Sequence, residues 1–246
     1  MLFRACPSCC GGDAPAGGRQ RPEGRTMKIG PAVRRLMPPG FERRAAAVYR
    51  RVFVDLRKIA AVLARALPTD AHLLDVGGGD GELLNHLLAA RPDLRVTMVD
   101  VAGSVGKFVE PAPGARVRRL PCTTIETHLE RLEAPYDAAL VSDVMHHLPG
   151  GYRPQFLRSI RGALAPGGSI FVKDIEPGHP IAWLSLVCDR YVSGDRGVAL
   201  VSLAELVALA EAELAPLAAA AEIGLHRVDA PNYLVRLDLA APGSAA

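Results

Sequence analysis

The first strong pattern along the chain is a stripe of apolar residues between positions 41 and 67. Charged side chains occupy about half of the positions between them, and Pro68 interrupts the pattern. Steps of three or four residues are the spacing of one face of an α-helix. The sequence therefore predicts an amphipathic helix that ends before Pro68. Its apolar face consists of Phe41, Ala45, Val48, Val52, Leu56, Ile59, Leu63 and Leu67.

Beyond Pro68 the pattern changes to short apolar runs that alternate with stretches of helical spacing. The runs LLDV, RVTMVD, YDAALVSD and SIFVKD read as buried strands, and a shorter run lies near 117–120. Two further strand-like runs, IGLHRV and YLVRLDL, close the chain. Helices are predicted at 82–90, near 127–133, from 152 to 164 and over the Ala/Leu/Glu-rich stretch 202–220.

Strands separated by helices are typical of the α/β class, in which the helices cover both faces of a sheet. The count of strands predicts a doubly wound sheet of seven mostly parallel strands with an antiparallel last strand. Such sheets bind their ligands beyond the carboxyl ends of the strands. The loops at those ends are therefore the place to look for chemistry.

Composition divides the chain into three parts. Residues 1–26 are rich in Gly, Pro and Arg and cannot build a core, so we expect a disordered segment there. Residues 27–67 hold the amphipathic helix and are expected to form an N-terminal helical lid. Residues 68–246 carry the alternating pattern as one domain. An insertion at about 175–200 interrupts the rhythm of this domain.

The overall composition excludes several classes of protein. No stretch approaches the roughly 18 consecutive apolar residues that a membrane span needs, and the N-terminal residues lack the apolar run of a secretory signal. Five cysteines, three of them within the first ten residues, form neither a disulfide framework nor a complete zinc site. We therefore expect a soluble cytoplasmic protein without a metal ion.

Charge is balanced overall but unevenly distributed. The chain has 29 basic and 26 acidic residues, a net charge of +3, which does not indicate a nucleic-acid partner. Residues 27–58 carry nine basic side chains against only Glu42 and Asp55, so the body that follows is acidic. Two interpretations stay open: the basic arm folds back on the acidic body, or it meets an anionic partner.

A glycine-rich loop follows the first predicted strand. It reads LLDVGGGDGELL, in which Asp75 ends the strand and Gly77, Gly79 and Gly81 alternate through the turn. Glycine permits positive φ and lets a ligand approach the backbone without meeting a Cβ. The G-x-G-x-x-G spacing of dinucleotide-binding loops is absent. Asp100, at the end of the second strand, stands where a carboxylate would accept hydrogen bonds from a ribose.

These motifs, together with YDAALVSDVMHHLP at 136–149 and LAPGGSIFVKD at 164–174, resemble those of class I S-adenosylmethionine-dependent methyltransferases. The resemblance covers about residues 70 to 240 and implies a Rossmann-like methyltransferase fold with S-adenosylmethionine as its cofactor. It implies that Asp75, Gly77 and Gly79 line the methionine part of the cofactor. Asp100 would bind the ribose, and Val101 would pack on the adenine.

One position departs from the family. An acidic residue often follows the third strand and receives the adenine amino group, whereas this chain has Cys122 and Thr123 there. A hydroxyl accepts that hydrogen bond more weakly than a carboxylate does. We therefore expect Cys122 or Thr123 to take over the adenine contact in a weakened form.

The loop after the fourth strand faces the reactive methyl group in this family. Here it supplies Asp143, His146 and His147. An imidazole is a suitable base at neutral pH, and a neighbouring carboxylate can orient it. We therefore expect one histidine, with a slight preference for His147, to take a proton from the acceptor. In the other interpretation the histidines only pack at the start of a helix.

The insertion and the lid suggest an acceptor class. Trp183 and Tyr191 in the insertion and Tyr49 on the N-terminal helix could form an apolar wall around a small acceptor. The expected function is methylation of a small apolar or aromatic molecule in quinone or natural-product biosynthesis. O-methylation is preferred to N- or C-methylation, and the expected partners include a second copy of the chain in a homodimer. Neither nucleic acid nor a membrane is an expected partner.

Two other functions remain open. The resemblance defines the cofactor-binding site better than it defines the reaction. The protein could therefore use S-adenosylmethionine in a rearrangement or an elimination instead of a methyl transfer. The fold could also serve as a binding or regulatory module without catalysis. Cofactor binding and the production of S-adenosylhomocysteine distinguish the three functions.

Overall fold

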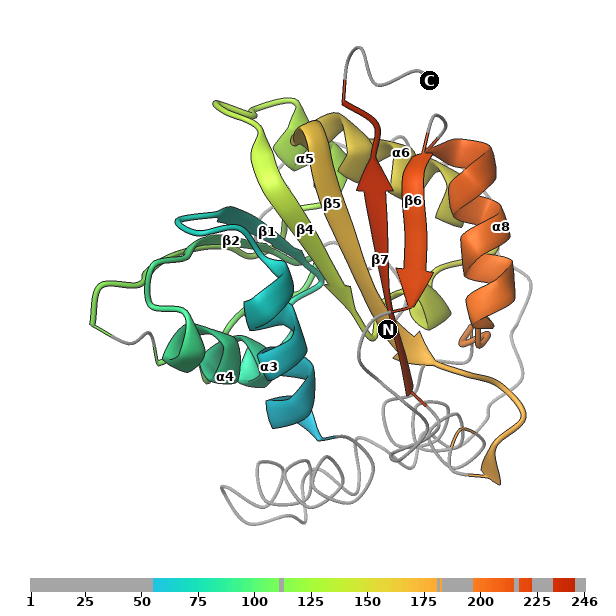
Figure 1. Ribbon diagram of the computed structural model, residues 1–246, viewed down its shortest axis with the longest axis horizontal. Helices are drawn as coiled ribbons and strands as arrows, with labels where there is room; N and C mark the ends of the chain where they lie inside the picture. Colours follow the sequence, from blue (N-terminus) through green and yellow to red (C-terminus); the bar gives the residue numbers. More distant parts are fainter. Residues whose placement is uncertain are drawn as a thin grey trace, which may run out of the picture.

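The computed structural model describes residues 55–110, 113–180, 182, 197–214, 217–222 and 232–241. Within these residues a seven-stranded sheet has the strand order β3-β2-β1-β4-β5-β7-β6 (Figure 1). The strands are β1 (His72–Val76), β2 (Arg95–Val99), β3 (Arg116–Leu120), β4 (Tyr136–Ser142), β5 (Leu164–Ile175), β6 (Leu217–Glu222) and β7 (Asn232–Leu239). The helices are α3 (Leu56–Ala66), α4 (Glu82–Ala90), α5 (Ile125–Leu129), α6 (Arg153–Ala163) and α8 (Leu203–Glu213), with a 3-10 turn η1 (Met145–His147).

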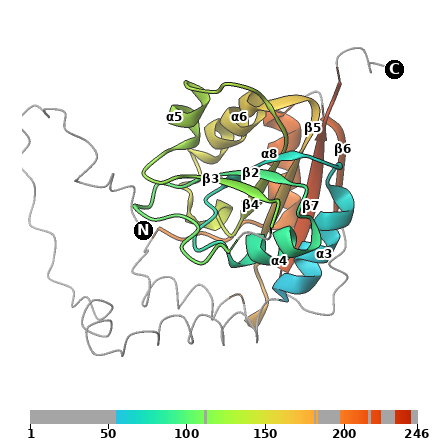
Figure 2. The same ribbon diagram turned by 90° about the vertical axis from the view of Figure 1, so that its left-hand side faces the viewer.

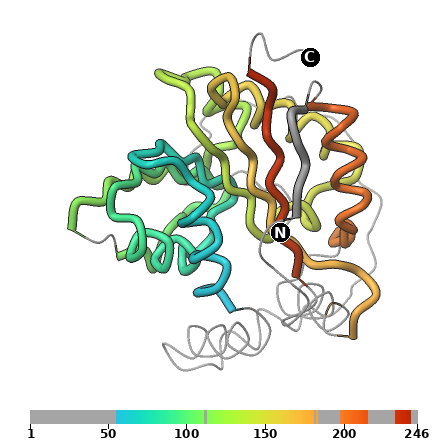
Figure 3. Tube along the Cα trace, in the orientation of Figure 1, coloured from blue at the N-terminus to red at the C-terminus, as the bar shows by residue number. Residues whose placement is uncertain are grey.

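Strands β1 to β5 pair in parallel, and β7 pairs antiparallel with both β5 and β6. The predicted α/β class with a mostly parallel sheet is therefore confirmed. The chain runs outward from β1 to β3 and then returns to the other side of β1 as β4. In Figure 3 this division is visible as a blue-green part, from α3 to β3, beside a yellow-to-red part, from β5 to β7.

The two faces of the sheet bury different side chains because successive residues of a strand point in opposite directions. Leu73, Ala138 and Leu140 lie in a core with α3 and α4. Leu74 and Ala139 lie in a second core with α6 and α8. The helices accordingly form two layers, α3 and α4 on one side and α5, α6 and α8 on the other (Figure 2).

Local chemistry explains where several helices begin. The Asp55 carboxylate caps α3 by accepting hydrogen bonds from the backbone N–H groups of Arg57 and Lys58. Ser202 and Glu205 form a reciprocal capping box at the start of α8. The boundaries of α4 agree with the predicted helix at 82–90, and α6 agrees within a residue with the predicted helix from 152.

The prediction of one continuous helix over 202–220 is wrong. Helix α8 ends at Glu213, and residues Leu217–Glu222 form the edge strand β6. The sequence LAAAAE has high helical propensity, but Pro216 cannot continue a helix, and β7 supplies a partner for backbone hydrogen bonds. Tertiary pairing therefore overrides the local preference of alanine.

Several predictions lie outside the described residues. They concern the segment 1–26, most of the predicted lid at 27–67, and Tyr49, Trp183 and Tyr191. The predicted strand IGLHRV also lies there. In the part of the chain that the structure describes, no helix is long and apolar enough to span a bilayer.

Arg91 joins the ends of α3 and α4. Its guanidinium donates to the backbone carbonyls of Ala64 (2.7 Å), Leu67 (2.9 Å) and Pro68, and it forms a double hydrogen bond with Asp93. The carbonyls at the end of a helix have no partner within the helix. One side chain thus caps α3 and fixes it beside the sheet.

We predict that Arg91→Ala lowers the free energy of unfolding by about 2 to 3 kcal/mol, because charge-assisted hydrogen bonds to otherwise unpaired carbonyls are lost. Arg91→Lys should recover only part of this, since an ammonium cannot reproduce the planar fork. Urea unfolding followed by circular dichroism measures both variants. Arg57→Ala, an exposed position on α3, is the matched control. If Arg57→Ala and Arg91→Ala lowered the free energy of unfolding equally, the capping role of Arg91 would be contradicted.

Candidate functional site

A cleft of about 220 Å³ lies at the carboxyl edge of the sheet, where the strand order changes direction between β1 and β4. Its walls come from the first residue of α3, the end of β1, the glycine loop, the first turn of α4 and the end of β4. They consist of Leu56, Asp75, Gly77, Gly78, Gly79, Asp80, Gly81, Glu82, Leu83, Leu84, Leu140, Ser142 and Asp143. The predicted cofactor loop therefore lines a cleft at the expected edge of the sheet.

The glycine loop uses conformations that other residues adopt at a cost. Gly77, Gly79 and Gly81 have φ values of +71°, +52° and +83°. Gly78 has no such φ, but a Cβ there would lie 2.3 Å from Oδ2 of Asp75. The residue at 78 must therefore be glycine to leave room for the buried carboxylate, a requirement that the predicted set of glycines missed.

Asp100 ties the ends of two strands to this loop. Its Oδ2 accepts a hydrogen bond from the N–H of Gly79 (3.0 Å), and its Oδ1 accepts one from the N–H of Ala102 (2.8 Å). The carboxylate is partly exposed. Each oxygen can accept a further hydrogen bond, so the group can hold the loop and receive ligand hydroxyls together.

Asp75 is 3% exposed at the end of β1. Burial and, to a lesser extent, the negative charge of Asp100 raise the pKa of the Asp75 carboxyl to about 7. Near neutral pH the group is therefore divided between its neutral and its charged form. A cationic ligand group placed beside it would favour the charged form.

The loops after β2 and β3 are joined to the glycine loop through Asp100. Val101 is 42% exposed, which is unusual for a large apolar side chain next to a buried strand. The backbone N–H of Cys122 donates to the carbonyl of Ala102 (2.9 Å), and that of Thr123 donates to the carbonyl of Asp100 (2.9 Å). Cys122 has a left-handed backbone, with φ of +53°. The four residues predicted to surround the ribose and adenine thus belong to adjoining loops.

The Thr123 hydroxyl is already used in this structure. It donates to the backbone carbonyl of Pro121 (2.9 Å). An oxygen that donates one hydrogen bond still has lone pairs to accept another. The arrangement therefore leaves Thr123 able to act as an acceptor, as the expected adenine contact requires.

Asp143 lies at the end of β4 and pairs with a buried lysine. Lys173 of β5 is 1% exposed, and its Nζ donates to Oδ1 of Asp143 (2.5 Å). Burial alone would raise the pKa of the Asp143 carboxyl, but Lys173, His146 and the Ser142 hydroxyl outweigh it, so the pKa is lowered. Asp143 is therefore ionised at neutral pH and faces the cleft.

From the sequence we expected Asp143 to orient a catalytic histidine. In the structure a different carboxylate, that of Asp174, is hydrogen-bonded to a histidine of this loop. Asp174, fully buried in β5, accepts from Nδ1 of His146 (2.6 Å) and from the backbone N–H of the same residue (3.2 Å). Since β4 and β5 are adjacent parallel strands, both residues lie near the same edge of the sheet. Asp174 ends the motif LAPGGSIFVKD, but it was not assigned from the sequence as a partner of a histidine.

The two histidines differ in exposure. His146 is 2% exposed, whereas His147 is partly exposed, and their ring centroids lie 4.1 Å apart. The carboxylate of Asp174 fixes the ring of His146 through Nδ1, which directs Nε2 away from it. His146 is therefore the better oriented imidazole, although His147 was slightly preferred from the sequence.

Comparison with known proteins identifies the central part of the chain. Residues 74–170 match the family described as "Methyltransferase domain". They include the glycine loop, Asp100 and both histidines. Residues 74–170 are thus similar to a methyltransferase domain, and we use this name for them.

The chain has relatives in Streptomyces. It is similar to the 3-hydroxy-5-methyl-1-naphthoate 3-O-methyltransferase of Streptomyces sahachiroi, with 28% identity over 138 residues, 55% of this chain and 36% of the relative. It is also similar to the aclacinomycin 10-hydroxylase RdmB of Streptomyces purpurascens, with 30% identity over 119 residues, 46% of this chain and 32% of the relative. The matched part spans about a third of the length of these relatives.

Solved structures share the fold of the methyltransferase domain. The mitomycin 7-O-methyltransferase MmcR superposes with a TM-score of 0.59 at 23% sequence identity, over 85% of this chain and 58% of that one. This likeness places the α/β sheet among methyltransferase folds.

The cleft of the methyltransferase domain has the features that S-adenosylmethionine requires. Glycines 77 and 79 expose backbone, Val101 offers an apolar surface, and Asp75 and Asp100 supply carboxylates. In the described part of the chain, no group of three or more His, Cys, Asp and Glu side chains is placed to hold a metal ion. The residues present thus fit an organic cation with hydroxyl groups.

The raised pKa of Asp75 predicts a specific pH dependence of stability. The folded chain holds a proton on Asp75 up to about pH 7, whereas the unfolded chain releases it near 3.8. The free energy of unfolding should therefore fall as pH rises from about 4 to about 7, by up to about 1.4 kcal/mol per pH unit.

Asp75→Asn should remove this contribution. The difference in the free energy of unfolding between the variant and the wild type should therefore grow from pH 4 to 7 and then stay constant. Urea unfolding of the cofactor-free protein at several pH values measures it. Glu211→Gln, at an exposed position on α8, is the control. Parallel stability profiles of wild type and Asp75→Asn would show that Asp75 titrates normally.

Proposed function

We propose that this protein transfers the methyl group of S-adenosylmethionine to a hydroxyl group of a small aromatic or apolar molecule. The observation that carries the proposal is the cleft of the matched domain, whose glycine loop is held by the carboxylate of Asp100, the residue before the exposed Val101. When bound, S-adenosylmethionine supplies an electrophilic methyl group on a positively charged sulfur.

The cofactor contacts follow from the position of each residue. Asp100 would accept hydrogen bonds from the ribose hydroxyls, and Val101 would pack against the adenine, with Cys122 and Thr123 at its edge. Gly77 and Gly79 would let the methionine part approach the backbone. Asp75 would face its ammonium group, which would draw the pKa of the carboxyl back down and keep it ionised.

The charge of the cleft favours a cationic ligand. Asp75, Glu82 and Asp143 line it, and Lys173 offsets the charge of Asp143 from within the sheet. Negative side chains near the start of α4 already interact with the positive end of the helix dipole. The dipole therefore attracts a phosphate less strongly there. This supports a sulfonium cofactor in preference to a dinucleotide.

His146 is our candidate for the base. With Nδ1 held by Asp174, Nε2 would take the proton of an acceptor hydroxyl as the oxygen attacks. Asp174 would act as a positioning residue, since it holds the ring and stabilises the imidazolium that forms. Asp143 would contribute negative charge to the cleft, and His147 remains the alternative base.

The acceptor class is supported by one relative. The Streptomyces sahachiroi protein is named as an O-methyltransferase of a hydroxylated naphthoate, a flat aromatic hydroxyl compound. A wall of Trp183, Tyr191 and Tyr49 would suit such a ring, and these roles remain predictions, as do the homodimer and the cytoplasmic location. Natural-product biosynthesis is accordingly the proposed setting.

Calorimetric titration with S-adenosylmethionine, S-adenosylhomocysteine and NAD tests the cofactor assignment. We expect micromolar binding of the first two and none of NAD. Asp100→Ala should weaken S-adenosylhomocysteine binding at least tenfold, because a charge-assisted hydrogen bond is worth about 1.5 to 3 kcal/mol. Asp238→Ala, on β7 away from the cleft, should not change it. An unchanged Kd for Asp100→Ala would remove the central assignment.

A panel of phenols, naphthols and hydroxyquinones, with S-adenosylhomocysteine production as the readout, tests the transfer. For an acceptor found in this way, His146→Gln should lower kcat about 10²- to 10³-fold, the usual effect of a general base. Asp174→Asn should lower kcat at least tenfold with the cofactor Kd within twofold of wild type. A larger loss in His147→Gln than in His146→Gln would reassign the base.

A second candidate function is chemistry that retains the cofactor without methyl transfer. The observation that favours it is the similarity of 119 residues of the chain to a relative named as a hydroxylase, RdmB. The same panel distinguishes the two functions. A methylated product formed in step with S-adenosylhomocysteine supports transfer, and an altered product without S-adenosylhomocysteine supports the alternative.

A further inference from the structure

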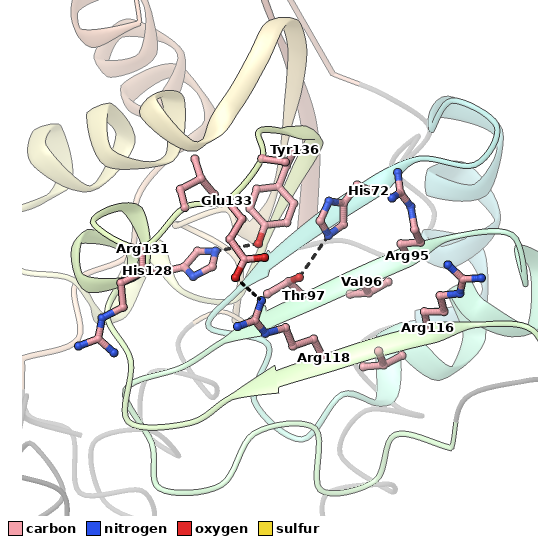
Figure 4. Close-up of a pocket in the computed structure, with 13 residues that line it drawn as sticks. His72, Arg95, Val96, Thr97, Arg116, Arg118, His128, Arg131, Glu133 and Tyr136 are labelled. Atoms are coloured by element: carbon pink, nitrogen blue, oxygen red, sulfur yellow. Dashed lines mark hydrogen bonds and ion pairs between the residues drawn. The ribbon is translucent and has the colours of Figure 1, made fainter.

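A second hollow, of about 320 Å³, lies at the opposite edge of the sheet from the cofactor cleft. It opens beside the first residues of β1, β2, β3 and β4, on the face that carries α5 (Figure 4). Five-residue strands at about 3.3 Å per residue separate the two edges. This amino-end pocket, as we name it, therefore shares no lining residue with the cofactor cleft.

Arginines form the rim of the amino-end pocket. Arg95, Arg116, Arg118 and Arg131 line it, and all four are exposed (Figure 4). Glu133 is the acidic residue of the lining, and it reaches Arg118 only at 4.0 Å, with both side chains well exposed. A distant exposed pair of this kind contributes little. The rim therefore keeps a strong positive charge.

Two of these arginines oppose each other in the sheet. Arg95 and Arg116 are direct cross-strand partners of β2 and β3. Like charges at directly opposed positions destabilise a strand pair. In the part of the chain that the structure describes, no carboxylate forms an ion pair with either of them. A bound anion would turn this repulsion into attraction.

The floor of the amino-end pocket is polar and buried. Thr97, Tyr136 and His128 are 3%, 3% and 6% exposed. His128 Nε2 lies 2.7 Å from the Tyr136 hydroxyl, and His72 Nε2 lies 3.3 Å from the Thr97 hydroxyl (Figure 4). These side chains hold one another in place, which gives the arginine rim a rigid base with hydroxyl and imidazole groups.

Both imidazoles are uncharged at neutral pH. Burial and then the neighbouring Arg95 lower the pKa of His72, against a smaller opposite effect of Asp137. Burial and then Arg118 lower the pKa of His128. The floor therefore offers hydrogen bonds, and the arginines supply the charge. Planar guanidinium groups match the oxygens of phosphate and carboxylate in a two-pronged contact.

The chain's own N-terminal segment is a poor occupant. Residues 1–54 contain 11 basic and only 3 acidic side chains, so the arginine rim would repel them. The volume suits a small molecule, whereas a nucleic-acid backbone is bound by an extended basic surface. We propose that the amino-end pocket binds the phosphate group of a small phosphorylated molecule, with the arginines on its oxygens and the buried hydroxyls beneath it.

This site is independent of the proposed methyl transfer, so it is tested on the full chain with inorganic pyrophosphate as the probe. We expect saturable binding by calorimetry, with chemical-shift changes in the side-chain NMR signals of His72 and His128. Saturating S-adenosylhomocysteine should leave the pyrophosphate Kd unchanged. Competition between the two would place the anion in the cofactor cleft and overturn the proposal.

Variants of the exposed rim give a second test. Arg95→Gln and Arg116→Gln should each weaken pyrophosphate binding at least tenfold and raise the melting temperature of the ligand-free protein, because the cross-strand repulsion is removed. Arg65→Gln, at an exposed position on α3, is the matched control and should change neither. Equal binding by all three variants and wild type would show unspecific attraction and overturn the proposal.

The source of the phosphate is decided by comparing phenyl phosphate with inorganic phosphate, both in the presence of saturating S-adenosylhomocysteine. Tighter binding of phenyl phosphate supports a phosphate ester whose organic part contacts the apolar wall at Leu132 and Tyr136. Equal binding supports the site but assigns it to free phosphate. Failure of all three phosphates to bind would overturn the proposal without affecting the methyltransferase assignment.

Discussion

Three carboxylates at the carboxyl edge of the sheet impose the main physical constraint on this protein. Asp75, Asp143 and Asp174 lie at the ends of adjacent strands. Asp75 and Asp174 are buried, Asp143 contacts the buried Lys173, and a charge taken out of water is costly unless it is compensated. The structure solves the problem in three different ways. Asp75 has a pKa raised to about 7, Asp143 pairs with Lys173, and Asp174 pairs with His146. The polar architecture of the site follows from these compensations.

The three compensations also separate the roles within the site. A carboxyl group that is only partly ionised in the free protein can respond to a cationic ligand, whereas one held by a lysine keeps a constant charge. A carboxylate bound to an imidazole fixes its orientation. In the proposed function, these similar side chains would therefore have different roles, because their partners differ: Asp75 would respond to the ligand, Asp143 would supply charge and Asp174 would position His146.

Much of this arrangement could be predicted from local sequence. The glycine loop, Asp100 and helix 82–90 depend on residues that are close in the chain, so their spacing is informative. The strand β6 could not be predicted in this way, because the sequence LAAAAE is locally helical and becomes a strand only through pairing with β7. Periodicity describes one element at a time and does not include its neighbours in space.

The Asp174–His146 pair joins residues 28 positions apart, on β5 and after β4. The sequence contained a signal for this pair, because parallel strands bring their carboxyl ends together and both residues follow apolar runs. The choice of Asp143 as the partner relied instead on proximity in sequence. A charged residue inside a buried run, as with Lys173, should likewise have indicated a partner on the adjacent strand.

Close packing between two loops has a mechanical consequence. A Cβ on Gly77 would lie 2.5 Å from Cγ2 of Val144, so the glycine turn and the start of the histidine segment fit against each other without spare space. Any larger residue at position 77 would therefore push Val144 away and displace the start of the segment that carries His146.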